Sequence, residues 1–112
     1  MKRIIRKATL QDAEQLAAIQ AICQSTQTTP SPNLELDEAL WKIYLTNPNY
    51  AVYVIEDRIV VGFIAGQFLS QLGKMAISEA FILKRYEKAF DREMLYDTLT
   101  STTYDFTQNI TG

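Results

Sequence analysis

The spacing of hydrophobic positions changes three times along this chain, and these changes divide it into elements. Residues 3–8 (RIIRKA) have the alternating pattern of a strand, and from Thr9 to about Gln24 apolar residues recur at helical spacing. Thr9 fits an N-cap, and Asp12 stands three residues later, as in a capping box. The predicted apolar positions of this first helix are Leu10, Ala13, Leu16, Ala17, Ile19, Ile22 and Cys23.

A polar connection and a second helix are predicted next. Residues 25–33 (STQTTPSPN) contain two prolines, which predicts a surface loop; a loop that gates a substrate is the alternative. Asp37 can cap the second helix, and Asn47-Pro48 ends it because the residue before proline is pushed out of helical geometry. The predicted inner positions of this helix are Leu40, Trp41, Tyr44 and Leu45.

Three strand-like runs follow one another with short turns between them. The first two, residues 50–56 and 59–69, are joined by the turn Asp57-Arg58, and the third covers residues 75–83. This order predicts an antiparallel meander. Gly62 and Gly66 lie inside the second run and predict a bulge or a close backbone approach there.

A last helix is predicted to begin near Glu87 or Lys88 and to include Leu99. Phe90 and Met94 define one of its sides, and Leu95 and Leu99 lie next to them. Charged residues of both signs lead into this helix: Lys84, Arg85, Lys88 and Arg92 alternate with Glu87, Asp91 and Glu93. The mixture predicts a solvated, salt-bridged helix start in which each ion pair contributes little. Phosphate binding by the four cations is the alternative.

Composition narrows the class of protein. The 112 residues are 47% hydrophobic and 21% charged, which is ordinary for one globular domain covering residues 1–112. The net charge of −2 gives no general attraction to nucleic acid or to an anionic membrane. The longest apolar run, residues 59–65, is far shorter than the ~20 residues that span a bilayer. No apolar h-region follows the basic start, so we expect a cytoplasmic protein.

Two residue types limit the chemistry that is available. Histidine is absent, which excludes Ser-His and Cys-His nucleophiles and any His-ligated metal site, so we expect no metal. Cys23 is the single cysteine, so no internal disulfide forms, and its place on the apolar side of a helix predicts an inert thiol. Glu, Asp, Lys and Tyr remain as acids and bases. Four tyrosines are alternatives as general acids or as core residues: Tyr50, Tyr53, Tyr86 and Tyr96.

Glu79 is the strongest catalytic candidate. Strict alternation places five residues on one face of the third strand run: Met75, Ile77, Glu79, Phe81 and Leu83. A carboxylate on an otherwise apolar face has its charged form disfavoured, which raises its pKa and suits a general base. The alternative is a Glu79 that lies at an open edge or pairs with a Lys or Arg.

The order strand, helix, helix, three antiparallel strands, helix resembles the first two-thirds of the GCN5-related N-acetyltransferase (GNAT) superfamily. Three stretches carry the resemblance: RIIRKATLQDAEQLAAI with its T-x-x-D start, DRIVVGFIAGQF, and ISEAFILKRYEKAFDREMLYDTL. They are similar to that family's first strand and helix, its second and third strands, and its fourth strand with the cofactor-binding helix. The resemblance implies an α+β, GNAT-like fold in a single truncated domain, without the family's usual C-terminal strands.

The resemblance also implies acetyl-coenzyme A as the cofactor and a base-like role for Glu79. The backbone groups of Ile82 and Leu83 match the strand that hydrogen-bonds pantetheine in the family. The family's pyrophosphate loop has the form R/Q-x-x-G-x-G/A, and its glycine positions fall here on Lys88, Phe90 and Arg92. None of the three is glycine. If coenzyme A binding is retained, the side chains of Lys88 and Arg92 are its candidate phosphate ligands.

Two functions from different classes therefore stay open. One is a non-catalytic interaction or regulatory module of GNAT-like fold in which coenzyme A binding is weakened or lost. The other is an acetyl-CoA-dependent N-acetyltransferase acting on a small-molecule or peptide amine. In either case the Met75–Leu83 strand leaves a long apolar sheet edge, and unpaired edges template association. We expect a homodimer or a partner chain there, with no nucleic-acid or membrane partner.

Overall fold

The computed structural model describes residues 3–24, 34–69 and 71–111 of the 112-residue chain. The elements in chain order are β1 (Ile4–Lys7), η1 (Leu10–Asp12), α1 (Ala13–Gln24), α2 (Leu34–Thr46), β2 (Tyr50–Asp57), β3 (Ile59–Leu69), β4 (Lys74–Ile82), η2 (Lys84–Tyr86) and α3 (Asp91–Thr111). The α+β order predicted from the sequence is confirmed. Residues 25–33, where a surface or gating loop is predicted, lie outside the described residues.

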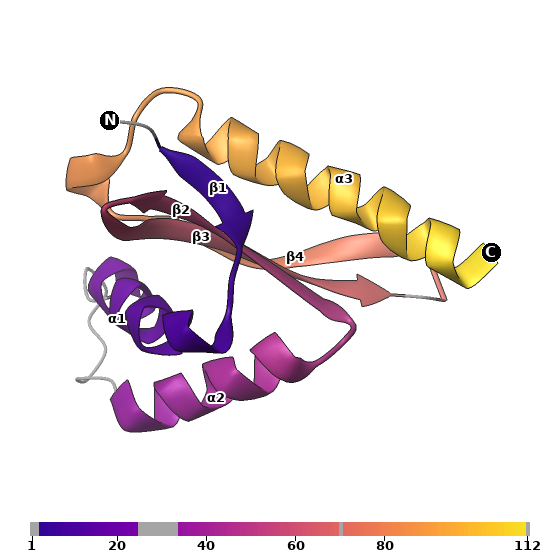
Figure 1. Cartoon of the computed structure of the whole chain (residues 1–112), viewed down its shortest axis with the longest axis horizontal. Helices are drawn as coiled ribbons and strands as arrows, with labels where there is room; N and C mark the ends of the chain where they lie inside the picture. The colour runs from indigo at the N-terminus through magenta and orange to yellow at the C-terminus, as the bar shows by residue number, and fades with distance from the viewer. Residues whose placement is uncertain (1–2, 25–33, 70, 112) are drawn as a thin grey trace.

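The four strands form one antiparallel sheet in the order β1-β2-β3-β4. The predicted meander is confirmed, and its first turn has Arg58 at a φ of 68°. Figure 1 shows α1 and α2 covering one face of the sheet and α3 crossing the other. The described helices include none that is long and apolar enough to cross a membrane.

The sheet separates two apolar cores. On the α1/α2 side Phe63 of β3 packs edge-on against Trp41 of α2, with ring centroids 5.0 Å apart. The other buried residues on this side are Ala13, Leu16, Ala17, Ile19, Val52, Val54, Val60 and Ala65. On the α3 side the buried residues are Ala51, Ile55, Val61, Ile64, Ile82, Leu95 and Leu99.

Some predicted inner positions of the first two helices are exposed. Leu10 and Ile22 at the two ends of the first helical segment are 50% and 57% exposed, and Leu40 of α2 is 40% exposed. The predicted cap at Asp37 is wrong, because α2 begins at Leu34 and position 37 lies inside it.

Two glycines of β3 lie where another element approaches the backbone closely, as predicted. A Cβ on Gly66 would lie 3.0 Å from Cδ2 of Leu99 in α3. A Cβ on Gly62 would lie 2.9 Å from Cγ1 of Ile82 in β4. The helix α3 and strand β4 can therefore pack against β3 only because these two positions lack side chains.

A β-bulge interrupts the pairing of β3 with β4 at Gly66. Ala65 pairs with Glu79 and Gly66 pairs with Ile77, so Ser78 is an extra residue without a partner across the strands. Directly paired residues share a face of the sheet. Ile77 therefore lies on the α3 face with Gly66, and Glu79 lies on the α1/α2 face with Ala65.

The bulge overturns the predicted single face of β4. Met75 packs in the core beneath α3, whereas Phe81 and Leu83 pack in the core beneath α1 and α2. An extra residue inverts the alternation of every position that follows it, so residues before and after Ser78 that share parity face opposite ways. Glu79 consequently does not share a face with Met75 and Ile77.

A buried carboxylate joins the first strand to the first helix. The N–H of Thr9 donates to Oδ2 of Asp12 over 2.7 Å, as the predicted capping box requires. Arg6 of β1 donates to both oxygens of Asp12, over 2.8 and 3.0 Å, and from Nε to Glu56 over 3.1 Å. The hydrogen bonds from Arg6 are the main reason why the pKa of Asp12 lies below its ordinary value.

We expect Asp12→Asn to lower the free energy of unfolding near neutral pH by about 1–3 kcal/mol, because the substitution removes a charge-assisted interaction of a buried group. The pKa of Asp12 is lower in the folded than in the unfolded chain, so its contribution is present above about pH 4 and is lost as the pH falls through the folded value. Urea unfolding at a series of pH values should therefore give a difference that shrinks on acidification.

The exposed Glu14→Gln, close to Asp12 in sequence, is the matched control and should follow the native chain at every pH. A difference between Asp12→Asn and the native chain that stays constant from neutral to acid pH would contradict this assignment.

Candidate functional site

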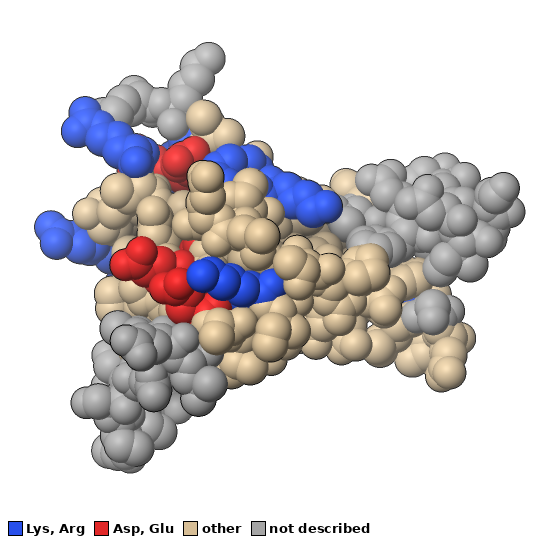
Figure 2. Space-filling model, turned by 60° about the horizontal axis from the view of Figure 1, so that its bottom comes forward, with Lys and Arg blue, Asp and Glu red and all other residues tan. Residues whose placement is uncertain are grey.

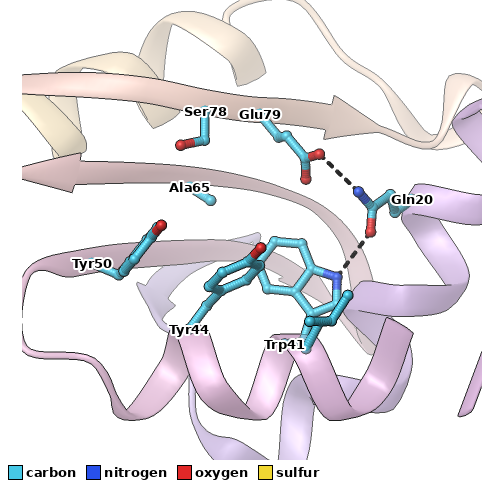
Figure 3. A pocket seen from close by; sticks show the side chains of 8 residues that line it. Gln20, Trp41, Tyr44, Tyr50, Ala65, Ser78 and Glu79 are labelled. Atoms are coloured by element: carbon cyan, nitrogen blue, oxygen red, sulfur yellow. Dashed lines mark hydrogen bonds between the residues drawn. The ribbon is translucent and has the colours of Figure 1, made fainter. Parts of the chain in front are cut away.

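A pocket of about 160 Å³ lies between the sheet and the helices α1 and α2 (Figure 3). We call it the Glu79 pocket. Its lining residues are Gln20, Leu40, Trp41, Tyr44, Tyr50, Ala65, Ser78 and Glu79. The bulge in β4 explains why two consecutive strand residues, Ser78 and Glu79, both line it.

A chain of two hydrogen bonds sets the orientation of groups in this pocket. The indole Nε1 of Trp41 donates to Oε1 of Gln20 over 3.0 Å, and Nε2 of Gln20 donates to Oε1 of Glu79 over 2.8 Å. An indole N–H can only donate, so the carbonyl of Gln20 must face Trp41 and its NH₂ must face Glu79. The network thus presents an N–H of Gln20 to a carboxyl oxygen of Glu79.

Aromatic rings form the opposite side of the Glu79 pocket. The ring of Trp41 meets that of Tyr44 edge to face at 5.7 Å, and Tyr44 lies 4.9 Å from Tyr50 at a tilt of 33°. Figure 3 shows Trp41 and Tyr44 rising from α2 toward Glu79, which projects from β4. Trp41 is buried, and its contact with Phe63 anchors this wall in the core.

A second pocket of about 360 Å³ lies where β4 leads toward α3. We call it the junction pocket. Its lining residues are Ile22, Cys23, Phe81, Ile82, Leu83, Lys84, Glu87 and Arg92. Three of the four predicted cofactor residues, Ile82, Leu83 and Arg92, therefore come together here. Lys88 does not line the pocket, and the N–H of Leu83 is used within the sheet, where it donates to the carbonyl of Val61 over 2.8 Å.

Cys23 also faces the junction pocket. Its Sγ lies 3.9 Å from the carbonyl oxygen of Ile82, and burial raises the pKa of the thiol. A raised pKa leaves little thiolate at neutral pH, which is consistent with the inert thiol that the sequence predicts. Within the described ranges, no three His, Cys, Asp or Glu side chains gather closely enough to hold a metal ion.

The backbone between β4 and α3 has an unusual residue in a left-handed conformation. The N–H of Asp91 donates to the carbonyl of Lys88 over 3.2 Å, which closes a turn, and Phe90 within it has a φ of 74°. Glycine is the usual residue at such a position because it has no Cβ. Phe90 is also one of the three positions at which the resemblance places a loop glycine. The left-handed backbone is present there without the residue that normally adopts it.

Asp91 is buried at the start of α3, with 2% of its surface exposed. Its Oδ2 accepts the N–H of Lys88 over 2.7 Å and Nη1 of Arg3 over 3.1 Å. Arg3 also donates to the carbonyl of Tyr86. The predicted solvated helix start is therefore wrong for Asp91, and α3 begins at Asp91 rather than at residue 87 or 88.

The same ion pair lies on the buried side of α3. Because Arg3 holds Asp91 against the sheet, the residues one and two turns later, Leu95 and Leu99, are the ones buried. Phe90 is 71% exposed and Met94 40% exposed. At the exposed surface Arg92 donates from Nε to Glu87 over 2.8 Å, as the alternating charges predict.

The predicted tyrosine candidates separate into different environments. Tyr50 lines the Glu79 pocket, whereas Tyr53 and Tyr86 pack against the core beneath α3 and Tyr96 is exposed. Seen from the α2 side, Figure 2 shows acidic and basic side chains next to one another, with a broad uncharged area beside them. This face carries no continuous surface of one charge.

No protein-family model matches the sequence, and no curated protein matches it either. Among solved structures, a possible acetyltransferase of Clostridium difficile 630 superposes with a TM-score of 0.75 at 14% identity, over 91% of this chain and 71% of the other. A putative GNAT family acetyltransferase of Staphylococcus aureus gives 0.75 at 16% identity, over 90% and 91%. The fold is that of the GNAT acetyltransferases.

A PaiA N-acetyltransferase of Thermoplasma acidophilum, solved in complex with coenzyme A, matches the same GNAT-like fold with a TM-score of 0.73 at 13% identity. It covers 94% of this chain and 74% of the other. At such identities the likeness establishes the fold alone. The GNAT-like fold that the sequence predicts is confirmed. The assignment of candidate sites depends on the contacts of this chain's own residues.

Sequence reasoning missed Gln20, Tyr44 and Ser78 as parts of a site. A glutamine on the polar side of a helix carries no signal of its own, and its contact with Glu79 depends on the bulge. Arg3 was equally hidden, because it lies 88 residues from its partner Asp91.

The left-handed backbone at position 90 can be tested by comparing glycine with alanine. We expect Phe90→Gly to be more stable than Phe90→Ala by about 1 kcal/mol, because alanine retains the steric cost of a positive φ. At the neighbouring Ala89, which has no positive φ, Ala89→Gly should instead destabilise by about 0.5–1 kcal/mol. Thermal and urea unfolding measure both; a lower stability of Phe90→Gly than of Phe90→Ala would refute the geometry.

Proposed function

We propose that this chain is a non-catalytic interaction or regulatory module built on the acetyltransferase fold, in which coenzyme A binding is weakened or lost. One observation supports the proposal most strongly. Carboxylates of the chain itself already accept hydrogen bonds from the backbone N–H and the guanidinium that could otherwise bind a phosphate. The N–H of Lys88 donates to Asp91, and the guanidinium of Arg92 donates to Glu87.

Phosphates bind to helix N-termini through backbone N–H groups and close approach of the main chain. At this junction the three positions that the resemblance assigns to glycine carry the side chains of Lys88, Phe90 and Arg92. Asp91 is also neutralised by Arg3, so the pair adds no free cation to the junction. Glu87 adds a negative charge to the pocket that Arg92 lines. The occupied N–H of Lys88, the carboxylate of Glu87 and the bulky side chains in place of glycine oppose an incoming pyrophosphate.

An acetyl-CoA-dependent N-acetyltransferase is the second candidate, favoured by a different observation. Glu79 lines one pocket, and Ile82, Leu83 and Arg92 line the next pocket along the same strand. A general base beside an elongated cofactor groove needs this order of groups. The exposed Glu87–Arg92 ion pair contributes little stability and a tightly held phosphate could displace it.

Titration with acetyl-coenzyme A separates the two candidates. A ligand that binds only the folded chain raises its stability by about 2.7 kcal/mol at a hundredfold excess over its dissociation constant. We expect millimolar acetyl-coenzyme A to leave both the melting temperature and the calorimetric baseline unchanged. A saturable stabilisation that is lost in the double variant Lys88→Ala, Arg92→Ala would overturn the proposal and favour the enzyme.

A gain of binding tests the physical cause. The double variant Glu87→Gln, Phe90→Gly releases Arg92 from its carboxylate and removes the exposed ring from the turn. We expect acetyl-coenzyme A binding to become measurable in it. Glu93→Gln with Phe90→Gly is the matched control, because it removes the same charge outside the junction pocket. Equal gains in both variants would show that release of Arg92 from Glu87 is not the cause.

We propose a second copy of the chain as the partner along β4. This edge strand has nine residues from Lys74 to Ile82, and its Ile77 is 47% exposed. The opposite edge, β1, has four residues and includes Arg6 and Lys7, which discourage pairing. Antiparallel pairing of β4 with its own copy closes a two-fold dimer.

Sedimentation equilibrium over a wide concentration range tests this partner. We expect a dimer that Ile77→Lys converts to a monomer, because a charge on an exposed edge strand blocks strand addition. Ile43→Lys, at a position 60% exposed on α2, is the control and should leave the dimer intact. A chain that stays monomeric at every concentration would count against the proposal.

A further inference from the structure

We propose that two copies of the chain pair along β4 in one specific register, with the two-fold axis between Ser78 and Glu79, so that each Glu79 pocket is bordered by both copies. The inference rests on the second copy proposed above as the partner of β4, and it adds the alignment of the two strands. The position of the β-bulge, the sizes of the opposing side chains and the direction of the backbone groups support this alignment.

The β-bulge divides β4 into two halves whose side chains alternate in opposite senses. The residues on the α3 face are Met75 and Ile77 before the bulge, and Ala80 and Ile82 after it. The residues on the α1/α2 face are Lys74, Ala76, Glu79 and Phe81, and Ser78 lines the pocket on the same face. The order of faces is therefore the same when it is counted outward in either direction from the point between Ser78 and Glu79.

This symmetry selects one antiparallel alignment of two copies. Residues that lie directly opposite each other in a sheet share a face, so α3-face residues of one copy must meet α3-face residues of the other. Setting Ile77 opposite the partner's Ala80 satisfies this condition along the whole strand. It also sets Met75 opposite the partner's Ile82, Ala76 opposite the partner's Phe81 and Ser78 opposite the partner's Glu79.

Other alignments fail at the bulge. A two-fold axis through Ser78 would set Ile77 opposite the partner's Glu79, which lies on the other face of the sheet. An axis between Ile77 and Ser78 would set those two residues opposite each other, and they also lie on different faces. An axis between Glu79 and Ala80 fails for the same reason. Alignments within one half of β4 preserve the faces but leave the other half of the strand unpaired.

The sizes of the opposing side chains match in the proposed alignment. Ile77, which is 47% exposed in the single chain, lies opposite the partner's Ala80, and Phe81 lies opposite the partner's Ala76. A large side chain thus meets a small one on each face, which lets the two edges approach without overlap. The exposed apolar surface of Ile77 becomes covered when the strands pair.

The backbone groups of β4 point in the directions that this alignment needs. The carbonyl oxygens of Ala76 and Phe81 lie 3.1 and 3.0 Å from a Cβ built on Gly66 and Gly62, so they point toward β3. Both residues have side chains on the α1/α2 face, and backbone direction alternates with side-chain direction along a strand. Residues on the α3 face therefore point their N–H and C=O groups away from β3. Ile77 can exchange both hydrogen bonds with the partner's Ala80.

The alignment joins the two four-stranded sheets into one and gives the partner a place beside the pocket. The axis is perpendicular to the sheet, so the α1/α2 faces of both copies lie on the same side. Ser78 lines the pocket of its own chain and also lies opposite the partner's Glu79, with Cβ atoms about 4.5–5.5 Å apart. A serine hydroxyl can donate to a carboxylate oxygen across such a pair.

Disulfide formation tests the register. In a Cys23→Ser background, the full chain with Ile77→Cys is mixed in turn with the Ala80→Cys, Met75→Cys and Glu79→Cys chains, and linked dimers are quantified after mild oxidation. Only the residues at positions 77 and 80 lie directly opposite each other, within the Cα separation that a disulfide spans. We expect the Ile77→Cys and Ala80→Cys mixture to link at least tenfold faster than either of the others.

The possible outcomes separate the register from the dimer itself. Faster linkage to Met75→Cys or Glu79→Cys overturns the register and leaves a dimer along β4 standing, as does equally slow linkage in all three mixtures of a chain that sediments as a dimer. A native chain that stays monomeric overturns the proposed partner and the register together. The acetyl-coenzyme A titration is a separate readout, so it decides the proposed non-catalytic function independently of all these results.

The native chain provides a measurement that needs no substitution. In a mixture of carbon-13-labelled and unlabelled chains, isotope-filtered NMR detects only contacts between different copies. We expect a nuclear Overhauser effect between the methyl groups of Ile77 and Ala80, which are separated by ~10 Å along the strand within one chain. A dimer without this contact would contradict the register.

Discussion

The extra residue in β4, Ser78, decides which way the second half of that strand faces. Without it, strict alternation would place Glu79 on the side of the sheet that α3 covers. With it, the carboxylate lies on the opposite side, within 2.8 Å of Gln20 on α1. The bulge occurs beside Gly66, whose missing side chain admits Leu99 of α3. One irregularity thus allows close packing on one face and creates a pocket on the other.

The junction after β4 depends on a different long-range interaction. Arg3 in the segment that leads into β1 holds Asp91 at the start of α3, and both side chains are almost wholly buried. Removing one partner of such a pair leaves an uncompensated buried charge, which makes the pair hard to break. The pair sets the rotation of α3, so that Leu95 faces the core and Phe90 faces solvent. It also keeps the N–H of Lys88 occupied. The stability of the helix start and the occupied N–H of the preceding turn therefore have one physical cause.

Local patterns were enough to predict the elements and their order. Helical spacing, Asn47-Pro48 and the turn at Asp57-Arg58 are encoded within a few residues, and each corresponds to a feature of the structure. The capping contact of Asp12 with Thr9 is equally local. These features follow from steric and hydrogen-bonding rules that act over short stretches of chain.

The candidate site could be predicted only in part. Glu79 was identifiable as a carboxylate in an apolar strand. The side of the sheet on which it lies depends on the bulge, which no residue type within β4 indicates. Gln20 and Arg3 take part through contacts across 59 and 88 residues. The positive φ of Phe90 contradicts the preference of its own residue type. Each of these features is imposed by tertiary packing rather than by local preference.

The proposed function requires the junction after β4 to be closed to phosphate by the chain's own carboxylates. Backbone amide resonances, followed by two-dimensional nitrogen–proton NMR during a titration with acetyl-coenzyme A, test this residue by residue. We predict that the amides of residues 87–92 stay unmoved at millimolar acetyl-coenzyme A. Saturable shifts at Lys88 and Arg92 would contradict the proposal.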